Sequence, residues 1–444
     1  MDANMDAPPD PKKCFDLVFD HTFCISVHPH FHSFDHLISL HPFTSPFTHY
    51  HSSTARSSPH LGTIMLAPSK RNTKQSKKSK RRATSKNTQK KERRNRINET
   101  KDPNRKFLKL IIHNFLNPDS TKIQYDLDTI FKLLEQALTD ITIQPTLLEF
   151  EAPTYVCGDI HGQITDLRRI FHICGYPNSK RFLFLGDYVD RGSHSVEVIC
   201  TLFALRLLFK DRVYLLRGNH ELAHINKSYG FYEDINNRWA TNPGKAKELY
   251  QKFNEVFSFL PLAAVVSGKI LCMHGGLSPL LHSLDDIRRL ERPITAPRGL
   301  AQDILWADPQ QGVCGFKNNS MRACSFNFGE KDVEERLKKM SLSKIIRAHQ
   351  VVSYGWEAFA NGRVITVFSA SRYQEDMCNY GAIVDIQKNL RMEIIMIKPA
   401  DYEETMNGIK DELTKEIPQT GKNEDEKSLR GKSERGKTSE DKDE

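Results

Sequence analysis

The chain has 444 residues, of which 39% are hydrophobic and 27% charged, a composition typical of a globular domain with polar tails. The nearest candidate for a membrane span, residues 14–27, is interrupted by Asp16, Asp20 and His21, and a span needs about 20 apolar residues. We therefore expect no membrane segment, and the acidic, proline-containing N-terminus predicts no secretory signal. The nine cysteines are scattered without a CxxC pair, which indicates reduced thiols in the cytoplasm or nucleus.

The net charge of +9 is concentrated in one segment. Residues 65–106 contain seventeen lysines and arginines against three acidic residues, and they lack the apolar residues that offset the entropy of folding. We predict a disordered basic arm, with three open interpretations: a nuclear-import signal, contact of residues 70–106 with nucleic-acid phosphates, or a solubilising tail. The histidine-rich residues 1–64 and the mixed-charge residues 401–444 are also predicted to be disordered.

Regular periodicity begins at Phe107. Residues 107–116 and 127–138 place apolar side chains three and four positions apart, which predicts two amphipathic helices. After Pro153, short apolar runs alternate with helical segments at residues 166–174 and 195–209, an order typical of βαβ units. Further β-rich runs between residues 363 and 398 predict a second sheet. The predicted fold class is therefore α/β, a β-sandwich flanked by helices in a domain at residues 107–400.

Four of the predicted strands end in polar clusters that contain glycine: GDIHG, GDYVDRG, RGNHE and HGG. In open α/β sheets, ligands bind at the carboxyl ends of the strands. These clusters and the later segment RAHQVV supply six candidate metal ligands, namely Asp159, His161, Asp187, Asn219, His274 and His349.

This ligand set combines carboxylates, an amide and imidazoles without a thiolate, which suits Mn, Fe or Zn. Six ligands exceed what one catalytic metal needs if it is to keep positions open for water, so two ions that share Asp187 are the simplest interpretation. Two cations about 3.5–4 Å apart can hold a hydroxide and a phosphoryl oxygen together, which favours phosphate-ester hydrolysis. Each residue alone could be an ordinary turn residue or packed histidine, but four such clusters in register favour a metal site.

The segments GDIHGQ, GDYVDRG, LLRGNHE, HGGLSP and RAHQVV resemble, in order and spacing, the signature motifs of the PPP family of serine/threonine phosphoprotein phosphatases. The resemblance extends over about residues 107–400, and the flanking segments LLEFEAP and CSFNFG are most similar to the type 1 catalytic subunit. It implies a metallophosphoesterase-like β-sandwich. It also implies hydrolysis of phosphoserine and phosphothreonine in proteins by water that two divalent metal ions activate.

The resemblance implies two ligand sets that share one carboxylate: Asp159, His161 and Asp187 for one ion, and Asp187, Asn219, His274 and His349 for the other. Mn²⁺ is expected to support activity in vitro, with Fe and Zn as the other candidates. His220 matches the general acid, which protonates the leaving oxygen, and Asp190 matches the carboxylate that orients it. Arg191 and Arg322 match phosphate-binding arginines, and Tyr373 matches a tyrosine on a loop that overhangs the site.

The loop around Tyr373 departs from the family pattern. Type 1 enzymes have Pro-Asn before the tyrosine and Cys-Gly after it, whereas this chain has Ser371 and Arg372 before it and Gln374 and Glu375 after it.

The groove that binds RVxF-type motifs of regulatory subunits also departs from the pattern. Ile270 and Leu390 keep apolar character, but Lys344 and Ala358 stand where the family has a leucine and an aromatic residue. A lysine in an apolar groove disfavours an apolar anchor, so we expect weak or altered binding of these regulators.

Two other functions stay open from the residues alone. Other dinuclear metallophosphoesterases hydrolyse nucleotides or nucleic acids, and the basic arm would suit such substrates. An inactive scaffold that delivers partners to RNA or chromatin is the second alternative, and the presence of every expected ligand and of His220 argues against it. The segments outside the ligand motifs favour protein substrates. The scattered cysteines predict a location in the cytoplasm or the nucleus.

Overall fold

The computed structural model describes residues 23–27, 37–42, 102–117, 126–374 and 377–399. Most of residues 1–64, most of the basic arm and the C-terminal tail lie outside this part of the chain, so the predictions for them stay predictions. Within residues 1–64, the structure describes two strands that the sequence did not predict, β1 (Phe23–Val27) and β2 (Leu37–Pro42).

The larger sheet has seven strands in the order β1-β2-β16-β15-β4-β5-β6. Besides β1 and β2, its strands are β4 (Thr154–Cys157), β5 (Phe182–Phe184), β6 (Val213–Leu215), β15 (Gly381–Ile386) and β16 (Met392–Ile397). The neighbours β4, β5 and β6 are parallel, whereas β15 runs antiparallel to β4 and β16. The carboxyl ends of β4, β5 and β6 therefore lie along one edge.

A second sheet has six strands in the order β13-β14-β12-β8-β7-β3. They are β3 (Leu147–Phe150), β7 (Ala263–Val266), β8 (Ile270–Met273), β12 (Lys344–Arg347), β13 (Trp356–Phe359) and β14 (Val364–Val367). Here β8, β12 and β14 are parallel. A small third sheet contains β9 (Asp308–Pro309), β10 (Lys317–Asn318) and β11 (Phe326–Phe328).

The helices of the described residues are α2 (Pro103–Leu116), α3 (Leu127–Thr142), α4 (Ile164–Cys174), α5 (Ser195–Leu208), α6 (Ala223–Asn226), α7 (Phe231–Arg238), α8 (Pro243–Ser258), α9 (Leu284–Arg288), α10 (Leu300–Trp306) and α11 (Glu330–Met340), with a short 3₁₀ turn at Asn219–Glu221. Among these residues, none of the helices has the length and apolar composition that crossing a bilayer requires.

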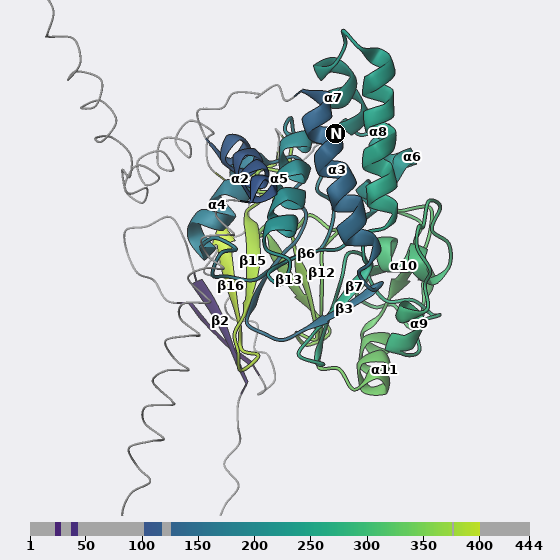
Figure 1. The fold of residues 1–444 in the computed structure, drawn as a ribbon. Coiled ribbons are helices and arrows are strands. Elements are labelled where there is room, and N and C mark those ends of the chain that lie inside the picture. Colours follow the sequence, from purple (N-terminus) through teal and green to yellow (C-terminus); the bar gives the residue numbers. More distant parts are fainter. Residues whose placement is uncertain (1–22, 28–36, 43–101, 118–125, 375–376, 400–444) are drawn as a thin grey trace, which may run out of the picture. The chain divides into compact units, whose positions relative to one another are not determined.

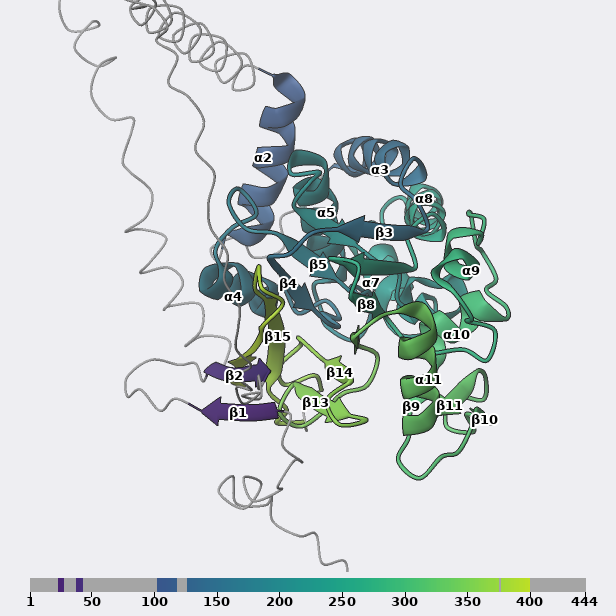
Figure 2. The same ribbon diagram turned by 90° about the horizontal axis from the view of Figure 1, so that it is seen from below.

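Among the described residues, three apolar cores hold these layers together. The first packs α2–α5, α7 and α8 against the seven-stranded sheet, through side chains such as Phe171 and Phe203. The second lies between the two large sheets and includes Val156 and Ile270. The third packs α10 and α11 against the six-stranded sheet, and Figures 1 and 2 show these two helices apart from the group formed by α2, α3, α5 and α8. The predicted β-sandwich flanked by helices is confirmed.

The sequence predicted that the strands after residue 363 form a second sheet of their own. In the structure they are divided between the two large sheets. β14 joins the six-stranded sheet beside β12, and β15 and β16 extend the seven-stranded sheet beside β4. Apolar runs identify strands, but they do not identify the partner of each strand.

The first helix of the domain begins earlier than the predicted boundary at Phe107. The carboxylate of Asp102 accepts a hydrogen bond from the backbone N–H of Asn104 at 2.9 Å, and Pro103 occupies the first turn. An aspartate cap followed by proline is a favourable helix start, so the last residues assigned to the basic arm, 103–106, are helical.

Candidate metal centre and active site

The six predicted ligands lie at or just after the carboxyl ends of five strands. Asp159, Asp187 and Asn219 follow β4, β5 and β6 in the seven-stranded sheet, whereas His274 and His349 follow β8 and β12 in the six-stranded sheet. His161 lies two residues after Asp159. All six are buried. The parallel strands of both sheets therefore bring these side chains to one place.

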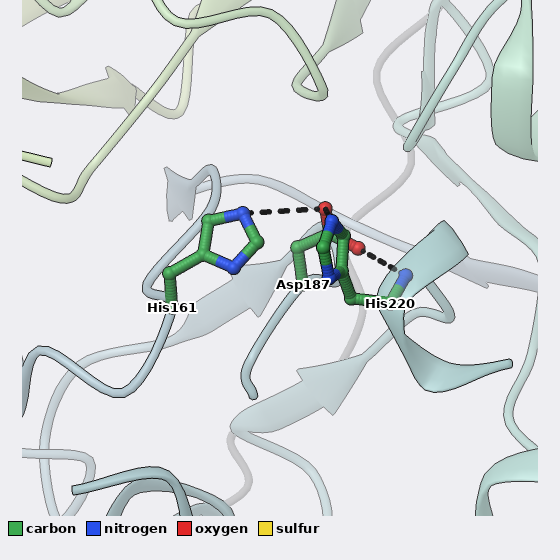
Figure 3. Close-up of side chains that lie close together, drawn as sticks. All are labelled: His161, Asp187 and His220. Carbon is green, nitrogen blue, oxygen red and sulfur yellow. Dashed lines mark hydrogen bonds and ion pairs between the residues drawn. The ribbon is translucent and has the colours of Figure 1, made fainter. Parts of the chain in front are cut away.

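Asp187 is at the centre of this cluster. Its Oδ2 lies 3.5 Å from Nε2 of His161 and 3.3 Å from Nε2 of His274. Its Oδ1 accepts a hydrogen bond from the backbone N–H of His220 at 2.8 Å, and Figure 3 shows His161 and His220 flanking this carboxylate. Within the described residues, two sets of ligand atoms lie within 4.8 Å of one another, and Asp187 belongs to both: His161, Asp187 and His220, and Asp187, His274 and His349.

The remaining ligands surround the same carboxylate. Oδ2 of Asp159 lies 3.6 Å from Nε2 of His161, and its Oδ1 accepts the backbone N–H of His349 at 3.0 Å. The side-chain oxygen of Asn219 lies 2.8 Å from Nε2 of His274. Oxygen and imidazole nitrogen atoms thus converge on one buried volume.

The orientation of the imidazoles fits a bound cation. Nδ1 of His161 lies 2.9 Å from the carbonyl of Val189, and Nδ1 of His274 lies 3.2 Å from the carbonyl of Leu185. Each Nδ1 can therefore carry the proton and donate a hydrogen bond to a carbonyl. The lone pair of Nε2 then faces carboxylate or amide oxygens. This is the usual arrangement of metal-binding histidines.

His349 belongs to the same cluster, because one of its ring nitrogens lies within 4.8 Å of ligand atoms of Asp187 and His274. Its Nε2 is buried without a hydrogen-bond partner in the described structure and lies 4.0 Å from Oδ1 of Asp308. The histidines oriented through Nδ1, together with the carboxylates and the amide, therefore fit a metal centre.

Burial and neighbouring charges shift the pKa values of several residues in the cluster. Burial opposes ionisation of Asp187, but the charges of His274 and His220 outweigh it and hold the pKa of this carboxyl well below its ordinary value. Burial also opposes protonation of His161, yet Asp159 and Asp187 raise its pKa to about 9. For His349, burial and then the charge of Arg322 lower the pKa well below its ordinary value, which keeps the ring neutral and able to bind a metal.

His220 and Asp190 form a separate pair at the edge of the cluster. Nδ1 of His220 lies 2.6 Å from Oδ2 of Asp190, and Asp190 is completely buried. The other oxygen of Asp190 accepts the backbone N–H of Phe231 at 2.9 Å. The carboxylate is thus fixed on both sides and can orient the imidazole.

Four residues of the site have strained backbone. His161, Asp187, Asp190 and His349 have φ angles between 45° and 74°, a region that residues with a Cβ rarely adopt. Such strain persists only where the surroundings hold it, and it is common at active sites. These turns redirect the chain at the strand ends so that the side chains point inward.

Glu221, which the sequence analysis did not single out, holds one of these turns. Its carboxylate accepts backbone N–H groups of Asp187 at 2.9 Å, Tyr188 at 2.8 Å and Gly218 at 2.8 Å. Burial, and then the charge of Asp187, raise the pKa of Glu221 to about 7. A Cβ at Gly218 would collide with the carboxylate of Asp187, so glycine is required there.

The predicted substrate-binding residues lie around the cluster. The ring of Tyr373 is 4.9 Å from that of His161, and burial raises the pKa of this tyrosine while the charge of Arg191 opposes the rise. The guanidinium of Arg191 lies over the ring of Tyr229 at 4.5 Å. A guanidinium N–H of Arg322 donates to the carbonyl of His349 at 3.3 Å.

Asp308 is a second residue that the sequence analysis did not assign to the site. Its carboxylate accepts hydrogen bonds from Arg322 at 2.9 Å, from Asn319 at 3.0 Å and from Arg347 at 2.8 Å. It thereby fixes the guanidinium of Arg322 beside the cluster. The sequence carried no signal for these partners.

Comparisons with known proteins agree with this geometry. A family model described as calcineurin-like phosphoesterase matches residues 152–353. A solved structure of a protein serine/threonine phosphatase from Saccharomyces cerevisiae, with similarity to human phosphatase PP5, is 30% identical, with a TM-score of 0.58 and coverage of 62% of this chain and 91% of that chain. A cold-active protein-tyrosine phosphatase of a psychrophilic Shewanella species is more distant, at 17% identity and a TM-score of 0.41, with 57% and 81% of the two chains covered.

Proposed function

Because the chain belongs to the calcineurin-like phosphoesterase family, we propose that it hydrolyses phosphoserine and phosphothreonine in proteins. The observation that carries the proposal is the cluster around Asp187, with the His220–Asp190 pair beside it. The first part is suited to hold divalent metal and the phosphoryl group, and the second to protonate the leaving oxygen.

The metal ligands divide into two sets that share Asp187. Asp159, His161 and Asp187 would hold one ion, and Asp187, Asn219, His274 and His349 the other. Two divalent ions bound there would polarise the phosphoryl oxygens and lower the pKa of water. We expect Mn²⁺ to support activity in vitro, with Fe and Zn as the other candidates, because the donors are oxygen and imidazole nitrogen without thiolate.

His220 acts as the general acid in this proposal. A serine alkoxide is a poor leaving group, so a proton from imidazolium Nε2 must reach the ester oxygen as the P–O bond breaks. Asp190 holds Nδ1 at 2.6 Å, which leaves Nε2 on the side of the metal ligands, 4.0 Å from Oδ2 of Asp187. Asp190 therefore orients the ring.

Arg191, Arg322 and Tyr373 bind the substrate phosphate in this proposal. Guanidinium groups stay charged and match phosphate oxygens with parallel N–H donors. Arg322 is held by Asp308 and by the carbonyl of His349, so little side-chain entropy is lost when phosphate binds.

A protein substrate is supported by the likeness to the yeast protein serine/threonine phosphatase. The similar region covers 91% of the yeast chain. Hydrolysis of nucleotides or nucleic acids is the alternative within the same chemistry. Its one supporting feature is the basic arm, and residues 70–101 of that arm lie outside the described part of the chain.

The experiment is hydrolysis by the purified full-length chain with Mn²⁺, in which a phosphoserine peptide is compared with a nucleoside monophosphate and a phosphodiester. A kcat/KM at least about tenfold higher for the peptide is the expected result. Faster hydrolysis of either nucleotide substrate would refute the protein-phosphatase proposal while leaving the phosphoesterase assignment intact. A chain that binds Mn²⁺ and hydrolyses none of the three would favour a scaffold.

A further inference from the structure

The segment Ser369–Gln374, which we call the Tyr373 segment, follows β14 and carries Tyr373 to the metal ligands. The ring of Tyr373 packs against His161 at 4.9 Å and against Phe368 at 5.1 Å. Arg372, the preceding residue, has a φ of 49°. A left-handed arginine costs conformational energy, so other contacts must hold this segment in place.

Asp166 in α4 supplies such a contact. Its Oδ2 accepts the backbone N–H of Ser371 at 2.7 Å, and its Oδ1 accepts the hydroxyl of the same serine at 2.9 Å. Both residues are buried, with 4% and 7% of their surface exposed. Hydrogen bonds to a buried carboxylate are among the stronger ones in proteins.

The charge of Asp166 is compensated within the same contact. Arg169, one helical turn further along α4, donates to Oδ1 of Asp166 at 3.2 Å and approaches the Ser371 hydroxyl at 3.5 Å. The carboxylate therefore has a cation on one side and the Tyr373 segment on the other. A buried charge arranged in this way holds its partners in a defined geometry.

Asn379 holds the other end of the loop. Its side chain accepts the N–H of Tyr373 at 2.9 Å and donates to the carbonyl of Ala370 at 2.8 Å. These bonds lie within the loop, whereas the bonds that Asp166 accepts connect the loop to a different element. Contacts of this second kind, which include the bond from the Ser369 N–H to the carbonyl of Asp159 at 3.2 Å, fix the segment relative to the metal ligands.

A candidate metal ligand lies just before α4. His161 lies five residues before Asp166, and the intervening turn is fixed by hydrogen bonds from Gln163 to the carbonyl of Ile160 and from His161 to the carbonyl of Asp187. Asp166 therefore ties the Tyr373 segment to the rigid turn that positions His161.

The sequence at Ser371 departs from the type 1 pattern in a way that permits this contact. Type 1 enzymes have a proline at the position of Ser371, and proline has neither a backbone N–H nor a hydroxyl to donate. The restraint that a proline ring supplies to the backbone is replaced here by hydrogen bonds to Asp166.

We propose that Asp166 and Ser371 form a clamp that positions Tyr373 over the phosphoryl-binding site. Neither residue touches the reacting atoms; both act through Tyr373. The inference rests on the proposed function for its catalytic meaning, but the clamp itself can be tested without substrate.

The first test is amide hydrogen exchange in the full-length chain. Asp166→Asn keeps the size of the side chain but removes its charge and one acceptor, so exchange in the Tyr373 segment should accelerate by about tenfold, the effect of losing about 1.4 kcal/mol of hydrogen bonding. The matched control is Asp140→Asn, which changes another buried carboxylate, paired with Arg206 in the first core. The clamp would be overturned if exchange in the Tyr373 segment accelerated in Asp140→Asn, or if it did not accelerate in Asp166→Asn.

The second test is a double-mutant cycle with a phosphoserine peptide. Asp166→Asn should raise KM by about tenfold with less effect on kcat, and Ser371→Ala, which keeps the N–H, should raise it by about threefold. Ser371→Thr keeps the hydroxyl and should restore most of the affinity. In a Tyr373→Ala background, Asp166→Asn should change KM by less than about twofold, because residues that act through one another are not additive.

The two tests separate the possible failures. Additive effects in the cycle would overturn the positioning role even if exchange accelerates. Failure of the unaltered chain to hydrolyse any phosphopeptide would refute the proposed function, whereas the exchange rates would still decide whether the clamp exists.

Discussion

The metal-ligand cluster and the Tyr373 segment are held in different ways. The ligands follow strands of the two large sheets, and their strained turns are fixed by buried groups such as Glu221. The Tyr373 segment follows β14 and donates hydrogen bonds to the side chains of Asp166 and Asn379. The cluster is therefore suited to chemistry that stays the same across a family, and the segment to differences in how substrates are bound.

The largest effect should come from Asp187→Asn. This change removes the charge that faces both His161 and His274, so metal affinity should fall by more than about 100-fold, beyond the loss seen when only a supporting group is removed. Hydrolysis should fall to the level of a protein-free control. Metal analysis by mass spectrometry and peptide hydrolysis measure these effects.

Asp140→Asn is the control for this prediction, because it changes a buried carboxylate outside the cluster. Full metal content in Asp187→Asn would contradict the central position of this residue.

His220→Asn should affect the chemistry and spare the metal. The rate of phosphoserine hydrolysis should fall by about 100- to 10,000-fold, the usual contribution of proton transfer. With p-nitrophenyl phosphate the loss should be below about tenfold, because nitrophenolate leaves without a proton. An equal loss with both substrates would show that His220 does something other than donate a proton to the leaving group.

A substitution at Lys344 tests whether the predicted docking groove differs from that of the family. Lys344 pairs in register with Ile270, its Nζ donates to the carbonyl of Gly362 at 2.6 Å, and burial followed by the charge of Arg363 lowers its pKa to about 8. Lys344→Leu should increase the affinity for an RVxF-type peptide by about tenfold in calorimetric titration, because a desolvated apolar anchor replaces a cation.

Lys338→Leu changes an exposed lysine of α11 and serves as the control. Equal binding of the peptide to the unaltered chain and to Lys344→Leu would remove the basis for an altered groove.

The smallest effect concerns stability at a distance from the site. Burial, and then the charge of Glu393, raise the pKa of Asp385 to about 6. Because the folded chain holds this proton more tightly than the unfolded chain, stability should rise as the pH falls from about 6 towards 4. Asp385→Asn should therefore raise the melting temperature by a few degrees at pH 7.5 and leave it unchanged near pH 4. A gain of the same size at both pH values would contradict the raised pKa.

The positions of the candidate metal ligands could be predicted because each lies within a few residues of an apolar strand. GDIHG and HGG contain the ligand, the glycine and the strand end in one short segment, and the rule that sites form at strand ends places them together. β4, β5, β6 and β8 were recognised as short apolar runs, whereas β1 and β2 were not predicted and the partners of β14, β15 and β16 were not identified.

The supporting residues could not be predicted in the same way. Asp308 contacts Arg347, 39 positions away, and Asp166 contacts Ser371, 205 positions away. An aspartate near the start of a helix is an ordinary residue in a sequence, and its partner is decided only by the packing of distant elements. Glu221 lies inside a recognised motif, but nothing in the motif indicates that its carboxylate binds three backbone N–H groups.

The ligands of the cluster come from both large sheets: Asp187 follows a strand of one, and His274 follows a strand of the other. An ion held between them would act as a reversible cross-link across the sandwich, formed in the folded chain and absent from the unfolded one. Resistance to heat and to proteases should then depend on how slowly the ion leaves, more than on the apolar core alone. For such a protein, the availability of metal in the cell would set the lifetime of the chain as well as its activity.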